Sequence, residues 1–152
     1  MAKVLPRSHS RAAAVQALYQ ALVNGQESTS DADSLNFVTA ENSDKMDTKY
    51  FTTLVDGVTK EIDALDSELA YAVDRSLSDV DPVESSVLRI AVYEFIHRPE
   101  VPYRVVLNEA VELAKAFGGE KGHKYVNGVL DKMGSKLRAV EYKASKERRK
   151  KK

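Results

Sequence analysis

A cluster of basic side chains stands at the start of the first amphipathic segment, where simple electrostatics disfavours it. Arg7, His9 and Arg11 occur within "RSHSR", and apolar residues at helical spacing follow from Val15 to Leu22. The amino end of a helix is the positive end of its dipole, so acidic residues are normally favoured there. Arginines beside unpaired N–H groups would attract a phosphate, so this stretch predicts a polyanion-binding site.

Residue combinations that support catalysis or metal binding do not occur in the sequence. The three histidines, His9, His97 and His123, are far apart, and there is no cysteine. The stretch "GGEKGHK" lacks the GxxxxGK[ST] spacing of a phosphate-binding loop and follows a predicted helix instead of a strand. We therefore expect no enzyme activity, no metal site and no cofactor.

Charged residues are segregated along the chain, although the formal net charge is zero. Residues 1–26 carry +3, residues 27–100 carry −11, residues 101–142 carry +2 and residues 143–152 carry +6. This pattern predicts a polyanion-binding surface beside an acidic surface that suits a basic partner. We expect one folded domain at residues 1–142 and a disordered basic tail at 143–152, which can still add non-specific affinity.

The composition is that of an ordinary globular domain. The chain has 152 residues, of which 43% are hydrophobic and 30% charged, enough for one domain with its own core. No segment approaches the ~18 apolar residues of a transmembrane helix, and the first residues lack an apolar signal region. We expect a cytoplasmic protein that does not bind membranes.

Apolar periodicity predicts helices along nearly the whole chain and no convincing strand. The expected helices cover residues 10–23, 35–41, 48–73, 82–97, 103–117 and 123–137, and the third is long enough to break near Gly57. The fold class is therefore all-α, a compact bundle of six to seven helices.

The clearest boundary signals surround the two central segments. Asp81 is a helix cap, Pro82 takes the first helical position and Glu84 follows three residues after the cap. The pair Gly118-Gly119 predicts a helix end, and Gly128 predicts a close backbone contact within the last helix.

Three stretches carry a family resemblance. "RAAAVQALYQ", "SSVLRIAVYEF" and "VPYRVVLNEAVELAKAFGGEKGHKYVNGVLDKM" resemble the bacterial NusB family of transcription antitermination factors, over most of residues 7–134. The resemblance implies a helical fold of two small sub-bundles. It also implies an RNA-binding regulator that pairs with NusE, a small ribosomal protein, and binds boxA RNA. With other Nus factors, such a protein helps the RNA polymerase elongation complex pass terminators, notably in ribosomal RNA operons. It leaves both a monomer and a homodimer open.

The resemblance also implies where RNA and the partner bind. The arginine-rich arm of the family precedes the first helix and matches Arg7 and Arg11, but this chain has Ser8 and His9 where relatives have more arginine. The expected RNA-binding residues are Lys3, Arg7, His9, Arg11, Tyr19, Arg104, Lys121 and Lys124. The expected partner-binding residues are Glu84, Arg89, Tyr93 and Tyr125.

Several of these residues also have an ordinary structural explanation. Tyr19 either stacks on an unpaired base or is a core aromatic with its hydroxyl at the surface. Glu84 either contacts the partner or completes the capping behind Asp81. Lys121 and Lys124 either extend the basic surface or are merely solvated. The alternative function is a helical protein–protein adaptor with only non-specific nucleic-acid affinity.

Overall fold

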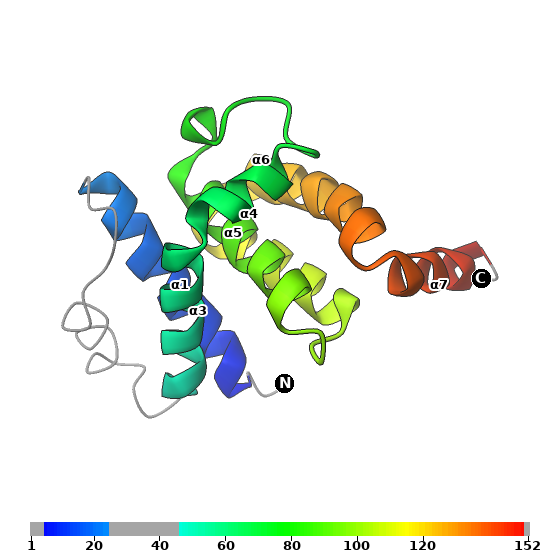
Figure 1. The fold of residues 1–152 in the computed structure, drawn as a ribbon, viewed down its shortest axis with the longest axis horizontal. Coiled ribbons are helices and arrows are strands. Elements are labelled where there is room, and N and C mark those ends of the chain that lie inside the picture. Colours follow the sequence, from blue (N-terminus) through cyan, green and yellow to red (C-terminus); the bar gives the residue numbers. More distant parts are fainter. Residues whose placement is uncertain (1–4, 25–45, 151–152) are drawn as a thin grey trace.

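The structure, a computed structural model, describes residues 5–24 and 46–150, in which helices are joined by short turns and no strand occurs. The order is α1 (Pro6–Val23), α3 (Thr48–Lys60), α4 (Ile62–Leu69), the 3₁₀-helix η1 (Leu77–Asp79), α5 (Pro82–His97), α6 (Tyr103–Leu137) and α7 (Ala139–Lys150). α1 and α3 lie side by side, α5 and α6 form the middle of the molecule, and α7 extends away from it (Figure 1). The predicted all-α fold is confirmed; the helix expected at residues 35–41 lies outside the described residues.

α5 is the central helix of the fold. It packs against α1, α3, α4 and α6, and ten of its residues are buried. The Asp81 carboxylate caps it as predicted, accepting hydrogen bonds from the backbone N–H groups of Val83 (2.9 Å) and Glu84 (3.3 Å). Neighbours on all sides explain why so little of the α5 sequence is polar.

A single hydrophobic cluster holds the helices together. It joins buried side chains of α1, α3, α4, α5 and α6, among them Phe51, Leu88 and Leu130. Each fully buried side chain of this size contributes about 1.5–3 kcal/mol. On α1 the buried face is built largely of alanines, which let its backbone approach α3 and α5 closely.

Two helix boundaries differ from the predicted ones. α1 begins at Pro6 instead of residue 10, because proline is well suited to the first helical position. The break in the segment that follows residue 47 occurs at Glu61, not near Gly57. Gly57 stays inside α3, where the ring of Tyr93 packs so closely that a Cβ atom would overlap it.

The prediction that a helix ends at Gly118-Gly119 is wrong, because the helical assignment of α6 continues through these residues. A straight helix of 35 residues would be about 50 Å long. Yet the Tyr103 ring at its start lies against Gly134 near its end, so α6 must bend sharply. The bend falls at the start of α5, where Cβ positions at Gly118 and Gly122 lie 3.7 Å from Val83 and 3.3 Å from Glu84. These glycines therefore permit a bend and a close approach instead of ending the helix.

The carboxyl-terminal residues also differ from the prediction. Residues 139–150 form the helix α7, whereas a disordered tail was expected from residue 143. The helix is held by contacts to residues far away in the sequence, including a hydrogen bond from the Tyr103 backbone N–H to the Glu141 carboxylate (2.8 Å). A contact between residues 38 positions apart cannot be predicted from the local charge pattern, which therefore did not indicate the helix.

Two glycines of α6 should respond oppositely to alanine. Gly128, predicted to be a packing position, is exposed with open space around its Cβ position, so that prediction is wrong. Gly134→Ala would push against the buried Tyr103 ring and should lower the free energy of unfolding by about 1–3 kcal/mol. Gly128→Ala should raise it by up to about 1 kcal/mol. Urea denaturation followed by circular dichroism measures both; equal effects would contradict the bent arrangement of α6.

Candidate nucleic-acid and protein interfaces

The amino end of α1 is fixed against the start of α3. Leu5 occupies the N-cap position without a side-chain hydrogen bond, and the first turn contains no acidic residue. The Ser10 hydroxyl donates to the Asp47 carbonyl (2.6 Å), and the Asp47 backbone N–H donates to the Pro6 carbonyl (3.3 Å). The basic residues at this end are therefore presented on a well-anchored helix.

Arg11, expected to bind RNA, is instead part of a buried ion pair. Only 3% of the residue is exposed. Its guanidinium donates two hydrogen bonds of 2.8 Å to the Glu94 carboxylate, and a further nitrogen lies 3.4 Å from Glu109. Burial opposes the charge, but the hydrogen bond and the two carboxylates outweigh it and raise the pKa of Arg11. Arg11 thus serves the fold and is not exposed to a ligand.

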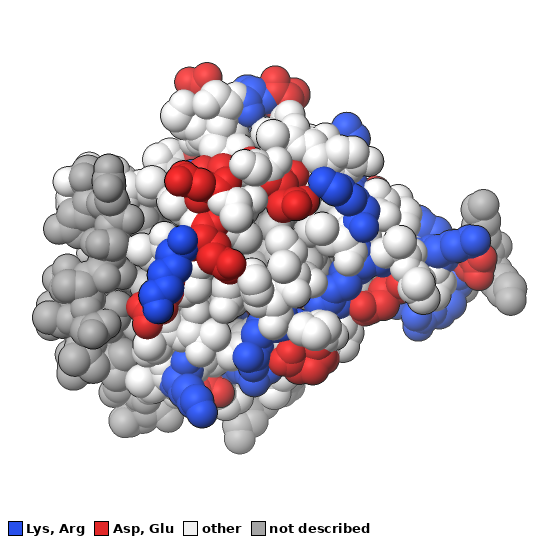
Figure 2. All heavy atoms as spheres, in the orientation of Figure 1, with Lys and Arg blue, Asp and Glu red and all other residues white. Residues whose placement is uncertain are grey.

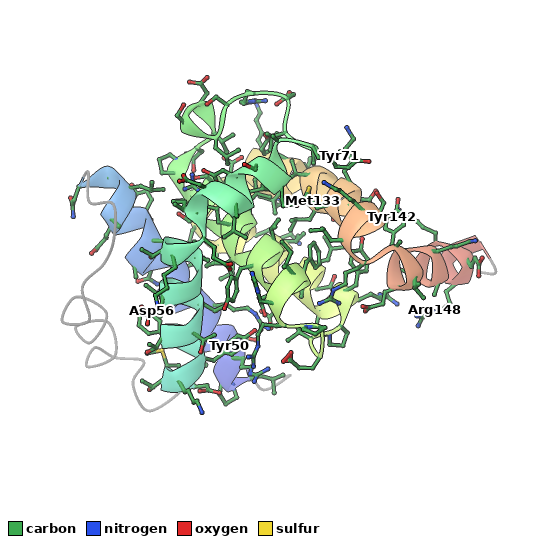
Figure 3. All side chains as sticks on the ribbon, viewed as in Figure 1. Tyr50, Asp56, Tyr71, Met133, Tyr142 and Arg148 are labelled. Carbon is green, nitrogen blue, oxygen red and sulfur yellow. The ribbon has the colours of Figure 1, made fainter. Side chains whose placement is uncertain are left out.

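Tyr50 of α3 completes this buried centre (Figure 3). Its hydroxyl donates to the Glu94 carboxylate at 2.5 Å. Burial, the charge of Glu94 and this hydrogen bond raise the pKa of Tyr50 far above its ordinary value, so the phenol stays protonated. The Ser8 hydroxyl and Arg11 both contact Glu109, which ties α6 to the same centre.

Arg7 is the exposed basic residue of this end. Its guanidinium lies 4.1 Å from the centre of the Tyr50 ring and its Nε lies 4.0 Å from the Asp47 carboxylate, with 40% of the side chain exposed. Arg98, which the sequence analysis missed, lies 5.3 Å from the same ring. The sequence around Arg98, just after the end of α5, does not indicate a binding role. Only the fold brings Arg98 to the same ring as Arg7.

The other expected RNA-binding residues fall at two ends of α5. α1 runs antiparallel to α5, since Arg11 pairs with Glu94 while Leu22 shares a groove with Ser85. Arg7 and His9 therefore lie at the carboxyl end of α5 and Tyr19, 38% exposed, toward its amino end. Arg104 lies in the first turn of α6, at the carboxyl end of α5. Lys121 and Lys124 follow the bend of α6, which lies at the amino end of α5. All three side chains are exposed. Lys3 lies outside the described residues.

Two of the expected partner-binding residues lie together at the start of α5. Glu84 is half-buried against Gly122, and burial and the charge of Asp81 raise its pKa. Tyr125 follows on α6, with the Arg75 guanidinium 5.0 Å from its ring centre. In the described part of the chain, the buried Tyr125 hydroxyl has no hydrogen-bond partner. This corner combines a half-buried carboxylate, an exposed guanidinium and a half-buried phenol.

The other two expected partner-binding residues are engaged within the fold. Arg89, predicted to bind the partner, is only 8% exposed and donates to the Asp66 carboxylate of α4 at 2.8 and 2.9 Å. It lines a groove of about 720 Å³ between the end of α1, α4 and the start of α5. Tyr93 packs on Gly57, and its ring centre lies 4.7 Å from that of His97. Its removal would therefore disturb the contact between α3 and α5.

Charges of opposite sign occupy different regions of the surface. Figure 2 shows acidic side chains gathered over α4 and the end of α3, which include Glu61, Asp63 and Glu68. Lys and Arg side chains, interleaved with acidic ones, follow the lower edge of the same view toward α7. Within the described residues, no group of histidine and acidic side chains could hold a metal ion, and no helix is long and apolar enough to cross a membrane.

Comparisons with known proteins agree on one family. The sequence model of the NusB family matches residues 8–135. The chain is 47% identical to a transcription antitermination protein NusB of Nitrosococcus oceani, over 94% of this chain and 95% of that protein. It is 44% identical to that of Thiobacillus denitrificans, over 93% and 97%.

Solved structures show the same fold. T. maritima NusB matches with a TM-score of 0.72 and 26% identity, over 88% of this chain and 93% of that one. A crystal structure of the antitermination factors NusB and NusE in complex with double-stranded RNA matches with a TM-score of 0.71 and 26% identity, over 90% and 96%.

The buried ion pair should show strong coupling between its two residues. Arg11→Met leaves the Glu94 carboxylate buried without its two guanidinium hydrogen bonds and should destabilise the fold by about 3–5 kcal/mol. Adding Glu94→Gln removes the uncompensated charge while an amide oxygen still accepts from Tyr50, so the double variant should recover part of that loss. Chemical denaturation of both single variants and the double variant gives the coupling energy. Additive losses would contradict the pairing.

Proposed function

The chain belongs to the NusB family, and we propose that it acts as an RNA-binding transcription antitermination factor together with NusE. Members of this family regulate transcription by binding RNA and are not enzymes. The observation that carries the proposal is the match of nearly the whole chain to a NusB bound to NusE and RNA. Within this function we propose boxA-type RNA as the target and the cytoplasm as the place of action, beside the elongating RNA polymerase.

We assign the RNA surface to the amino end of α1 and its neighbours. Arg7 supports this assignment because its partly exposed guanidinium lies in the first turn of α1, at the positive end of the helix dipole, which attracts anions. His9 is partly exposed in the same turn, and Arg104 lies at the same end of α5. Arg98 joins them as an addition to the expected set, while Arg11 leaves it because it is buried. Tyr19 offers an exposed ring for base stacking further along α1.

We assign the NusE surface to the corner formed by Glu84 and Tyr125. Their joint position at the start of α5, beside Arg75, supports a site that combines charge with an aromatic anchor. The acidic surface of α4 favours the approach of a basic partner, because a ribosomal protein that binds RNA is expected to be basic. Arg89 and Tyr93 contribute by shaping this face of α5, through Asp66 and Gly57, more than by exposed contacts.

The RNA surface is tested by Arg7→Ala. Loss of one phosphate contact should reduce the slope of log K against log salt by about 0.7 for single-stranded RNA and weaken binding at low salt. The ion pair of Arg11 is untouched, so the melting temperature should change little. Lys60→Ala, an exposed lysine at the end of α3, is the matched control and should leave the slope unchanged. Fluorescence anisotropy with boxA-type and scrambled RNA, with and without NusE, measures both; equal binding of the two RNAs would favour the adaptor alternative.

The partner surface is tested by Glu84→Gln. The substitution keeps the shape of the side chain but removes its charge, so NusE should bind about tenfold more weakly and associate more slowly at low salt. RNA binding by the isolated protein should not change. Glu147→Gln on α7 removes the same charge from a distant exposed position and serves as the control. Calorimetric titration with NusE decides; wild-type affinity of the Glu84 variant would place the interface elsewhere.

A further inference from the structure

α7 lies beyond the part of the chain that the NusB family model matches. The family model ends at residue 135, and α7 covers Ala139–Lys150. This helix contains five Lys or Arg residues and two Glu residues, and two further lysines follow it. It extends away from the bundle, with the chain terminus at its far end (Figure 1). The surface assigned above at the amino end of α1 does not account for this charge.

The first turn of α7 is built into the fold. The α6 N-cap, Pro102, offers no side-chain cap, and the Glu141 carboxylate takes that place by accepting from the Tyr103 backbone N–H at 2.8 Å. The other Glu141 oxygen accepts from Arg138 at 2.7 Å. The start of α7 is thus locked to the start of α6, which lies at the carboxyl end of α5.

Arg138 fixes the junction between α6 and α7. It is 8% exposed and donates to the carbonyl oxygens of Phe95 (2.9 Å), Arg98 (3.1 Å) and Val101 (3.0 Å). Helix carboxyl ends leave carbonyl groups unpaired and attract cations, so this guanidinium suits the end of α5. The direction in which α7 leaves the bundle is set by these bonds.

The inner side of α7 is held further along by Asp131 of α6. The Tyr142 hydroxyl donates to this carboxylate at 3.2 Å, and the Lys146 ammonium lies 3.1 Å from it. The Tyr142 ring packs edge-on against Tyr103 (centres 6.0 Å apart), and Ser145 is buried. The position of α7 is therefore defined over its first two turns.

Two cations of α7 remain directed to solvent. Lys143 and Arg148 are exposed, and within the described part of the chain neither has a salt-bridge partner. Arg148 lines a groove of about 320 Å³ that Arg104 also lines. Arg104 belongs to the proposed RNA surface at the same end of α5. In Figure 2, Lys and Arg side chains continue from the lower edge of the molecule onto α7.

We propose that α7, through Lys143 and Arg148 and together with Arg104, is an ordered arm that binds the backbone of RNA and extends the RNA surface beyond the amino end of α1. This rests on the proposed function, because RNA bound at the amino end of α1 is what the arm would follow. The surface of α7 does not suit a membrane, since Val140 is its one large apolar residue that is strongly exposed. Because the fold already orders the helix, its cations lose less conformational freedom on binding than those of a disordered tail.

Two variants separate an ordered arm from a mere charged tail. Lys143→Gln with Arg148→Gln removes two phosphate contacts and keeps the helix. Ala144→Pro keeps every charge but breaks α7 in its middle. Lys60→Gln with Lys115→Gln removes the same charge from α3 and α6 and is the control. Because α7 adds no residue to the central hydrophobic cluster beyond Tyr142, all three should keep the wild-type melting transition of the bundle.

The measurement is the binding of a boxA-type RNA and its scrambled counterpart to the full chain at several salt concentrations. In the Lys143/Arg148 variant, the slope of log K against log salt should be smaller by up to about 1.4. Between 50 and 200 mM salt, the wild-type affinity should therefore fall by a factor about seven times larger than the affinity of the variant does. Ala144→Pro should also weaken binding to both RNAs, while the control should not.

The outcomes distinguish the two proposals. Wild-type binding by the Lys143/Arg148 variant overturns the arm, and so does wild-type binding by Ala144→Pro, which would show that only the charge acts. If Arg7→Ala still weakens binding in either case, the proposed function stands. If the wild-type chain binds neither RNA, the proposed function is wrong, and so is the arm that rests on it.

Discussion

The buried pair of Arg11 and Glu94 is the constraint on which the arrangement of the other helices depends. A charged group costs several kcal/mol to take out of water unless partners satisfy it. Here the Glu94 carboxylate of α5 accepts hydrogen bonds from two guanidinium nitrogens of Arg11 on α1 and from the Tyr50 hydroxyl on α3. Glu109 adds α6 to the same centre. Four helices must therefore take one relative position, because any slip would leave a buried charge without its partner.

This centre also decides which arginine at the amino end of α1 can meet a ligand. Both Arg7 and Arg11 stand near the positive end of the helix dipole, which disfavours them. The fold resolves the conflict for Arg11 with two carboxylates and for Arg7 with the face of the Tyr50 ring. A ring face holds a cation weakly when the site is exposed, at about 0.5–1 kcal/mol, so Arg7 can still bind an anion. Of the two arginines, one thus holds the helix in place and the other remains at the surface.

Sequence patterns predicted what depends on neighbouring residues and missed what depends on distant ones. The cap at Asp81 and the all-α class follow from local spacing, and the structure has them. Gly118, by contrast, has the same local signal whether a helix ends or bends, and only the nearness of α5 decides between them. Arg11 looks like a surface cation until Glu94, 83 residues away in the chain, is brought to it.

The same reasoning applies to the carboxyl-terminal segment, whose composition alone predicts disorder. Its order comes from Arg138, which satisfies carbonyl groups at the end of α5, and from Glu141, which satisfies an N–H group at the start of α6. Unpaired groups at two helix ends thus create the anchor for a third helix. Because the start of α6 carries Arg104, the bonds that order α7 bring Arg148 to a groove that Arg104 also lines. The position of these cations therefore follows from how the fold satisfies its own backbone, and they lie away from the acidic surface of α4.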